Sequence, residues 1–95
     1  MIKKELYEKR WEIWREIWKS RPHKSEVSGT PIYGELKSFY MDHLIEHHGN
    51  ELLMFATWNQ VIVTEEEHRK KTSGNPLPKH LELILKAKQI YEKQK

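Results

Sequence analysis

Four residues in the middle of the chain are of the types that metal-dependent hydrolysis requires. Asp42 and His43 are adjacent. Asn59 is the first residue of an apolar run, and His68 lies nine residues after Asn59. Carboxylates and imidazoles are ligands of divalent cations, and a histidine with an ordinary pKa of about 6.5 can accept a proton from water at physiological pH. Each residue alone is more often structural, but together these types can supply a metal ligand, a general base and a brace.

Two predicted strands must position these groups. Residues 38–45 and 59–63 are rich in aromatic or β-branched side chains, which is typical of strands. The adjacent acid and histidine lie near the end of the first strand, and the asparagine begins the second. The fifteen residues between His43 and Asn59 predict a long loop that forms a wall of the site.

A short helix is predicted after the second strand. Thr64 and Glu67 have the spacing of a capping box, so the helix begins at Glu65. It ends near Ser73, because a glycine in a left-handed cap and an Asn-Pro pair follow. His68 therefore lies in the first turns of this helix.

Two longer helices are predicted at the flanks. The first covers residues 3–19, ends before Pro22, and carries aromatic residues at helical spacing: Tyr7, Trp11, Trp14 and Trp18. This spacing favours a buried face over a surface that stacks on unpaired bases. The second covers residues 78–93, and its apolar side is expected to pack against the first helix.

The length indicates one small domain, and the predicted strands and helices make it α+β. The chain has 95 residues and no cysteine, so neither disulfides nor thiolate zinc ligands can stabilise it. No segment approaches the length of a membrane span, and the start of the chain lacks the apolar core of a secretion signal. We therefore expect a soluble, cytoplasmic protein. The predicted parts of the domain, residues 1–95, are an N-terminal helix (1–21), a connector (22–37), a core (38–74) and a C-terminal helix (77–95).

Charge is distributed unevenly along the chain. Residues 1–24 contain eight Lys or Arg and four Glu, and residues 68–95 contain eight Lys or Arg and two Glu. Residues 25–67 contain one Lys and eight acidic residues. An acidic centre suits a divalent cation and basic flanks suit a polyanion, although lysine-rich flanks are also typical of solvated helix faces.

The order of these elements resembles the HNH endonuclease family and its ββα-metal fold. The resemblance covers residues 40–76 well and the connector more weakly. Family members commonly carry cysteine pairs that bind structural zinc. Thr64 and Glu67 occupy the positions of the second cysteine pair, and Ser25 and Ser28 resemble the first pair with serine in place of cysteine. The chain thus resembles the zinc-free branch of the family, which is common among phage-borne versions, and no structural zinc is expected.

The resemblance implies a role for each residue of the centre. His43 would be the general base, and Asp42 and His68 would hold one divalent cation. Mg²⁺ is the expected ion, with Mn²⁺, Ni²⁺ or Zn²⁺ as alternatives. Asn59 would brace the loop that orients the base. Double-stranded DNA is the implied partner, with Lys71 at the phosphate beside the metal.

Other polar residues are weaker candidates. Arg69 and Lys70 are expected to grip the DNA backbone, and Glu46 is a weaker additional metal ligand. His47 and His48 are more typical of a solvated loop than of a ligand pair. No role is assigned to two further histidines, His23 and His80.

The leading hypothesis is a metal-dependent HNH endonuclease that nicks or cuts DNA in a bacterial host cell. The alternative is a catalytically inactive HNH-like module of a phage or mobile element that binds DNA or protein. A third interpretation is a helical interaction protein that uses its tryptophan face. Whether that face closes the core, forms a homodimer or contacts a phage protein is left open by the sequence.

Overall fold

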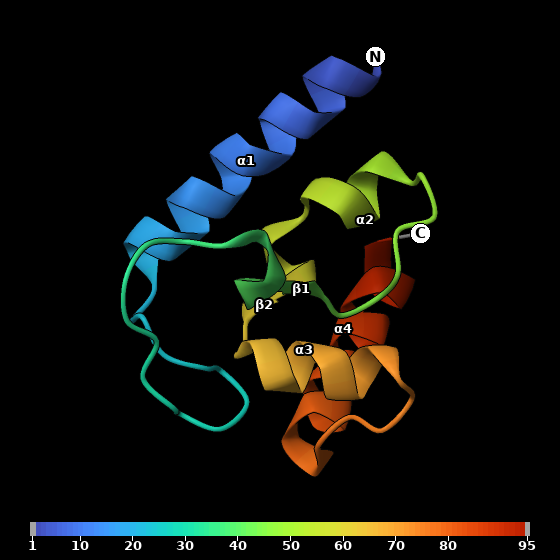
Figure 1. The fold of residues 1–95 in the computed structure, drawn as a ribbon. Coiled ribbons are helices and arrows are strands. Elements are labelled where there is room, and N and C mark those ends of the chain that lie inside the picture. The colour runs from blue at the N-terminus through green and yellow to red at the C-terminus, as the bar shows by residue number, and fades with distance from the viewer. Residues whose placement is uncertain (1, 95) are drawn as a thin grey trace.

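Two short antiparallel strands lie at the centre of the computed structural model, which describes residues 2–94 (Figure 1). β1 spans Met41–His43 and β2 spans Gln60–Ile62, with Met41 opposite Ile62. Successive side chains of a strand point to opposite faces, so this hairpin offers two surfaces for packing.

Four α-helices surround the hairpin in the described part of the chain, which confirms the predicted α+β class. They are α1 (Lys3–Ser20), α2 (Glu51–Phe55), α3 (Glu65–Thr72) and α4 (Pro78–Gln94). Single 3₁₀ turns, η1 (Ser38–Tyr40) and η2 (Thr57–Asn59), lead into the two strands. None of the helices formed by residues 2–94 is both long enough and apolar enough to cross a membrane.

The two faces of the hairpin are covered by different helices. One buried cluster joins α1 to the first face and contains Trp14, Ile17, Ile32, Met41 and Ile62. The second cluster joins α4 to the other face and contains Leu44, Val61, Val63 and Ala87. The prediction that the C-terminal helix packs against the first helix is therefore wrong, because the hairpin lies between their apolar faces (Figure 1).

The aromatic face of α1 is mainly a packing surface, as its spacing predicts. Trp14 is buried, and Trp11 and Trp18 pack against the same cluster. The indole Nε1 of Trp14 donates to Oε1 of Gln60 at 2.6 Å, which satisfies the only polar atom of the buried ring. Tyr7 remains exposed at the outer end of this face.

The region around the first strand differs from the prediction in two ways. The predicted strand over residues 38–45 is shorter, because residues 38–40 form the turn η1. The predicted loop contains the helix α2, whose first turn is capped by Asn50, since its side chain accepts from Leu53 N at 3.2 Å. This single helical turn is too short to show an apolar period.

The start of α3 is fixed by the predicted capping box and by a serine of the connector. Thr64 Oγ1 accepts from Glu67 N at 3.2 Å, and Glu67 Oε1 accepts from Thr64 N at 2.9 Å. Ser25 Oγ donates to the same carboxylate oxygen at 2.5 Å. Burial raises the pKa of Glu67, but hydrogen bonds from Ser25, Ser28 and Thr64 outweigh it and lower that pKa. The connector is thus joined to the start of α3 through Ser25 and Glu67.

Candidate functional site

Asp42 lies at the centre of a cluster of polar side chains on the α4 side of the hairpin. Its side chain is only 2% exposed. Oδ2 lies 2.8 Å from His80 Nε2, and Oδ1 lies 3.2 Å from Lys71 Nζ and 3.5 Å from His68 Nδ1. The strand β1 and the helices α3 and α4 therefore meet at one carboxylate.

His80 is the residue of this cluster that the sequence did not reveal. It is 0% exposed, and because a carboxylate oxygen can only accept, the imidazole Nε2 donates to Asp42. Its Nδ1 is buried without a hydrogen-bond partner among residues 2–94. Its spacing of four and seven residues from Ile84 and Ala87 is helical and could have indicated that His80 lies on the packed face of α4.

Asp42 and His68 are placed as a pair of metal ligands would be. Two ligand atoms that each lie about 2.0–2.2 Å from one ion are about 2.8–3.6 Å apart at angles between 90° and the tetrahedral angle. The observed separation of 3.5 Å falls within this range. His68 Nδ1 is also buried and has no hydrogen-bond partner within the described chain. The two residues therefore fit a cation in both spacing and chemistry.

The ligand set formed by this chain is small. Among residues 2–94, no group of three or more His, Asp or Glu side chains is arranged to hold a metal ion. Glu46, the weaker predicted ligand, is exposed, and its carboxylate lies 3.2 Å from Lys71 Nζ. The other coordination positions of an ion at Asp42 and His68 would fall to water or to phosphate oxygens.

His43 projects from the opposite face of β1, toward α2. Its Nε2 lies 3.0 Å from the carbonyl oxygen of Met54, and a neutral imidazole can make this bond only as the Nε2–H tautomer. Nδ1 then carries the lone pair. Burial is the main cause that lowers the pKa of His43, and the nearby charges of His47 and Arg10 lower it further, against the opposing effects of Met54 and Asp42. The imidazole is therefore held neutral, as a general base must be.

Asn59 is a buried brace between the loop after β1 and the helix α2. The residue is 0% exposed. Its Oδ1 accepts from Ile45 N at 2.8 Å, and its Nδ2 donates to Ile45 O at 2.9 Å and to Leu53 O at 2.8 Å. The next residue, Met54, supplies the carbonyl that orients His43. This geometry matches the bracing expected of Asn59.

The three residues predicted to contact phosphates all lie on α3, but their surroundings differ. Lys71 is only 11% exposed, and its ammonium donates to Asp42 Oδ1, to Glu46 Oε1 and, in a short contact, to the carbonyl of His43. Arg69 and Lys70 are exposed, and Lys70 pairs with Glu66 at 3.4 Å. Lys71 thus belongs to the polar cluster, while its predicted role at a phosphate stays a prediction.

The loop histidines are not arranged as a ligand pair. The ring of His47 lies 5.0 Å from that of His43 in an edge-on arrangement. His48 is exposed and has a positive φ of 43°. Burial, together with the charge of Arg10, lowers the pKa of His47.

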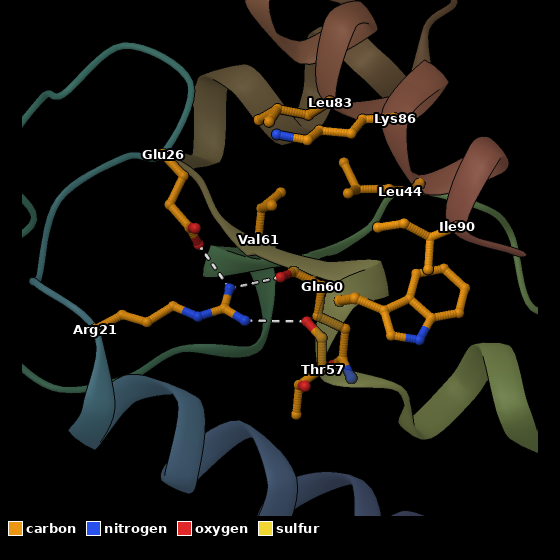
Figure 2. Close-up of a pocket in the computed structure, with 11 residues that line it drawn as sticks. Arg21, Glu26, Leu44, Thr57, Gln60, Val61, Leu83, Lys86 and Ile90 are labelled. Carbon is orange, nitrogen blue, oxygen red and sulfur yellow. Dashed lines mark hydrogen bonds and ion pairs between the residues drawn. The ribbon is translucent and has the colours of Figure 1, made fainter.

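A separate pocket of about 180 Å³ lies between α4 and β2, away from His43. Figure 2 shows Arg21 at its rim, where the guanidinium donates to Glu26 at 2.9 Å and to the carbonyls of Gln60 at 2.6 Å and Thr57 at 3.0 Å. The walls also include apolar side chains such as Ile90. Because these polar contacts tie the end of α1 to β2, we assign this pocket a structural role.

Comparisons of the chain with protein-family models, with curated proteins and with solved structures find no match. The functional assignment therefore rests on the residues of the site and on their geometry.

Proposed function

We propose that the protein is a metal-dependent endonuclease of the HNH type that hydrolyses phosphodiester bonds of DNA. The observation that carries this proposal is the approach of His68 Nδ1 to Asp42 Oδ1, at 3.5 Å, beside a histidine whose tautomer is fixed. His68 Nδ1 makes no hydrogen bond among residues 2–94, and the hydrogen bond to Asp42 Oδ1 comes from Lys71. A pair of metal ligands explains the placement of His68 beside Asp42.

His43 acts as the general base in this proposal. The carbonyl of Met54 holds Nε2–H, so Nδ1 accepts the proton of the attacking water. Asp42 and His68 would hold the divalent cation, which, when bound, would supply charge neutralisation at the scissile phosphate and at the leaving oxygen. His43 and Asp42 are adjacent on β1 but face opposite sides, and His68 approaches Asp42 from α3, so the reacting phosphate must lie at the end of this strand.

Two further residues keep these groups in place. His80 fixes the orientation of the Asp42 carboxylate by occupying Oδ2, so a cation would bind at Oδ1, which in this structure accepts from Lys71 Nζ at 3.2 Å. Asn59 holds the loop and the α2 segment whose carbonyl orients His43. Small displacements of such groups are costly in catalysis, because the reacting atoms must be aligned closely.

A second candidate function is a binding module that retains this architecture without cleavage. The observation that favours it is the ammonium of Lys71, which lies 3.2 Å from Asp42 Oδ1 and already neutralises the carboxylate. A cation that binds at Asp42 would have to displace or repel this ammonium. In the nuclease, Lys71 moves toward the phosphate; in the binding module, it stays on Asp42.

Supercoiled plasmid separates the two functions. The protein is incubated with plasmid in Mg²⁺, in Mn²⁺ and in EDTA, beside His43→Ala, His68→Ala and the control His23→Ala, which removes an exposed histidine outside the site. The nuclease predicts metal-dependent nicking by the wild type and by His23→Ala, with loss in the other two variants. Retention of DNA in a gel without nicking in any metal would favour the binding module.

A further inference from the structure

Arg10 of α1 reaches the α2 segment that orients the proposed base. Its Nη2 lies 4.0 Å from the sulfur of Met54, and the carbonyl of the same Met54 lies 3.0 Å from His43 Nε2. Arg10 and His43 therefore contact the same residue from two directions. The arginine is separated from His43 by 33 positions in the sequence, so only the fold brings them together.

The guanidinium of Arg10 has no acidic partner in the described part of the chain. The residues three and four positions away on the helix are Leu6, Tyr7, Ile13 and Trp14, none of which is charged. Arg10 Nε is buried without a hydrogen-bond partner among residues 2–94, and the sulfur atom near Nη2 is a weak acceptor. An arginine placed for structural reasons is normally paired, because unsatisfied charged donors are costly.

Arg10 and its neighbour Lys9 both lie over aromatic rings. The guanidinium carbon of Arg10 lies 5.7 Å from the ring centroid of Trp14, and the neighbouring Lys9 places its ammonium 4.6 Å from the ring centroid of Phe55. The pKa values of His43 and His47 are lowered mainly by burial and, in part, by the positive charge of Arg10. Two cations, Arg10 and Lys9, thus lie against Met54 and Phe55 at the end of α2, near His43, which suits an anion.

We propose that Arg10 binds a backbone phosphate of the DNA on the His43 side of the hairpin. This inference rests on the proposed nuclease function and adds a substrate contact to it. Asp42 and His68 lie on the other side of β1, so the DNA backbone would cross the strand end, with Arg10 holding the phosphate next to the one that reacts. Arg10 is a positioning residue, because it acts by placing the substrate and exchanges no proton.

This contact can be tested without cleavage. Fluorescence anisotropy measures the affinity of the protein for a short DNA duplex in EDTA at several salt concentrations. The matched variants are Arg10→Gln and Arg15→Gln. Both remove one positive charge from α1, but Arg15 is exposed on another face of the helix, beside Glu8 and Glu12. We expect Arg10→Gln to bind about tenfold more weakly than Arg15→Gln and to lower the salt slope by about 0.9, as for one lost phosphate contact. Arg10→Lys should recover part of the affinity, since it keeps the charge but not the planar donors.

Cleavage kinetics then separate the failure of this inference from that of the proposed function. In a cleaving enzyme, Arg10→Gln should raise KM more than it lowers kcat. Wild-type cleavage with equal DNA affinity in Arg10→Gln and Arg15→Gln would overturn the role of Arg10 alone. A wild type that neither binds nor cleaves DNA would overturn both. Thermal melting of each variant shows whether the fold is retained.

Discussion

Removal of the Asn59 side chain should destabilise the whole domain. Three hydrogen bonds at 2.8–2.9 Å join this fully buried amide to Ile45 and Leu53. At about 0.5–1.5 kcal/mol each, their loss in Asn59→Ala amounts to about 1.5–4.5 kcal/mol. A chain of 95 residues has a free energy of unfolding of about 5–14 kcal/mol, so the loss is a large fraction of the total.

Urea unfolding, followed by tryptophan fluorescence, measures this change in the free energy of unfolding. Asn75→Ala is the matched control, because Asn75 is exposed. Asn59→Asp tests the hydrogen bonds more specifically than Asn59→Ala. It keeps the acceptor for Ile45 N but places an oxygen against the carbonyl oxygens of Ile45 and Leu53. It should be at least as destabilising as Asn59→Ala. A change below about 0.5 kcal/mol in both Asn59 variants, equal to that of the control, would refute the bracing role.

Three further predictions concern neighbouring groups. His80→Ala should lower the free energy of unfolding by about 1.5–3 kcal/mol in urea, because it leaves the buried Oδ2 of Asp42 without its donor, while Oδ1 keeps the Lys71 ammonium; no change would contradict the pairing of His80 with Asp42. The lowered pKa of Glu67 contributes stability above pH 4.5 that is lost as the pH falls through its folded-state value. Ser25→Ala should therefore be less stable at neutral pH and show a shallower loss on acidification, whereas identical unfolding curves would exclude this link. Because the pKa of His43 is lowered, the acidic limb of kcat/KM should have its midpoint below pH 6.5; a midpoint above 6.5 would argue against His43 as the base.

The parts of the fold that depend on local interactions could be predicted from the sequence. The capping box at Thr64 and Glu67 joins residues three positions apart, and the structure begins α3 at the predicted Glu65. The aromatic spacing of α1 likewise predicts a buried face, and Trp14 is buried. Asp42 and His68 were predicted to converge, and their side chains lie 3.5 Å apart.

The parts that depend on distant contacts could not be predicted. His80 meets Asp42 across 38 positions, and Arg10 meets Met54 across 44. Their partners are set by how α1 and α4 cover opposite faces of the hairpin, and helical periodicity alone does not specify that arrangement. The helix α2 was missed for a local reason, since a five-residue helix shows little more than one turn of any pattern.

The rate at which supercoiled plasmid is nicked, compared between the wild type and His43→Ala at saturating Mg²⁺ or Mn²⁺, tests the central claim most directly. If His43 is the general base, nicking requires the metal and falls by about 10²–10⁴-fold in the variant, while DNA binding in EDTA stays unchanged. Nicking at an equal rate by His43→Ala, or nicking by the wild type that persists in EDTA, would contradict the proposed metal-dependent site.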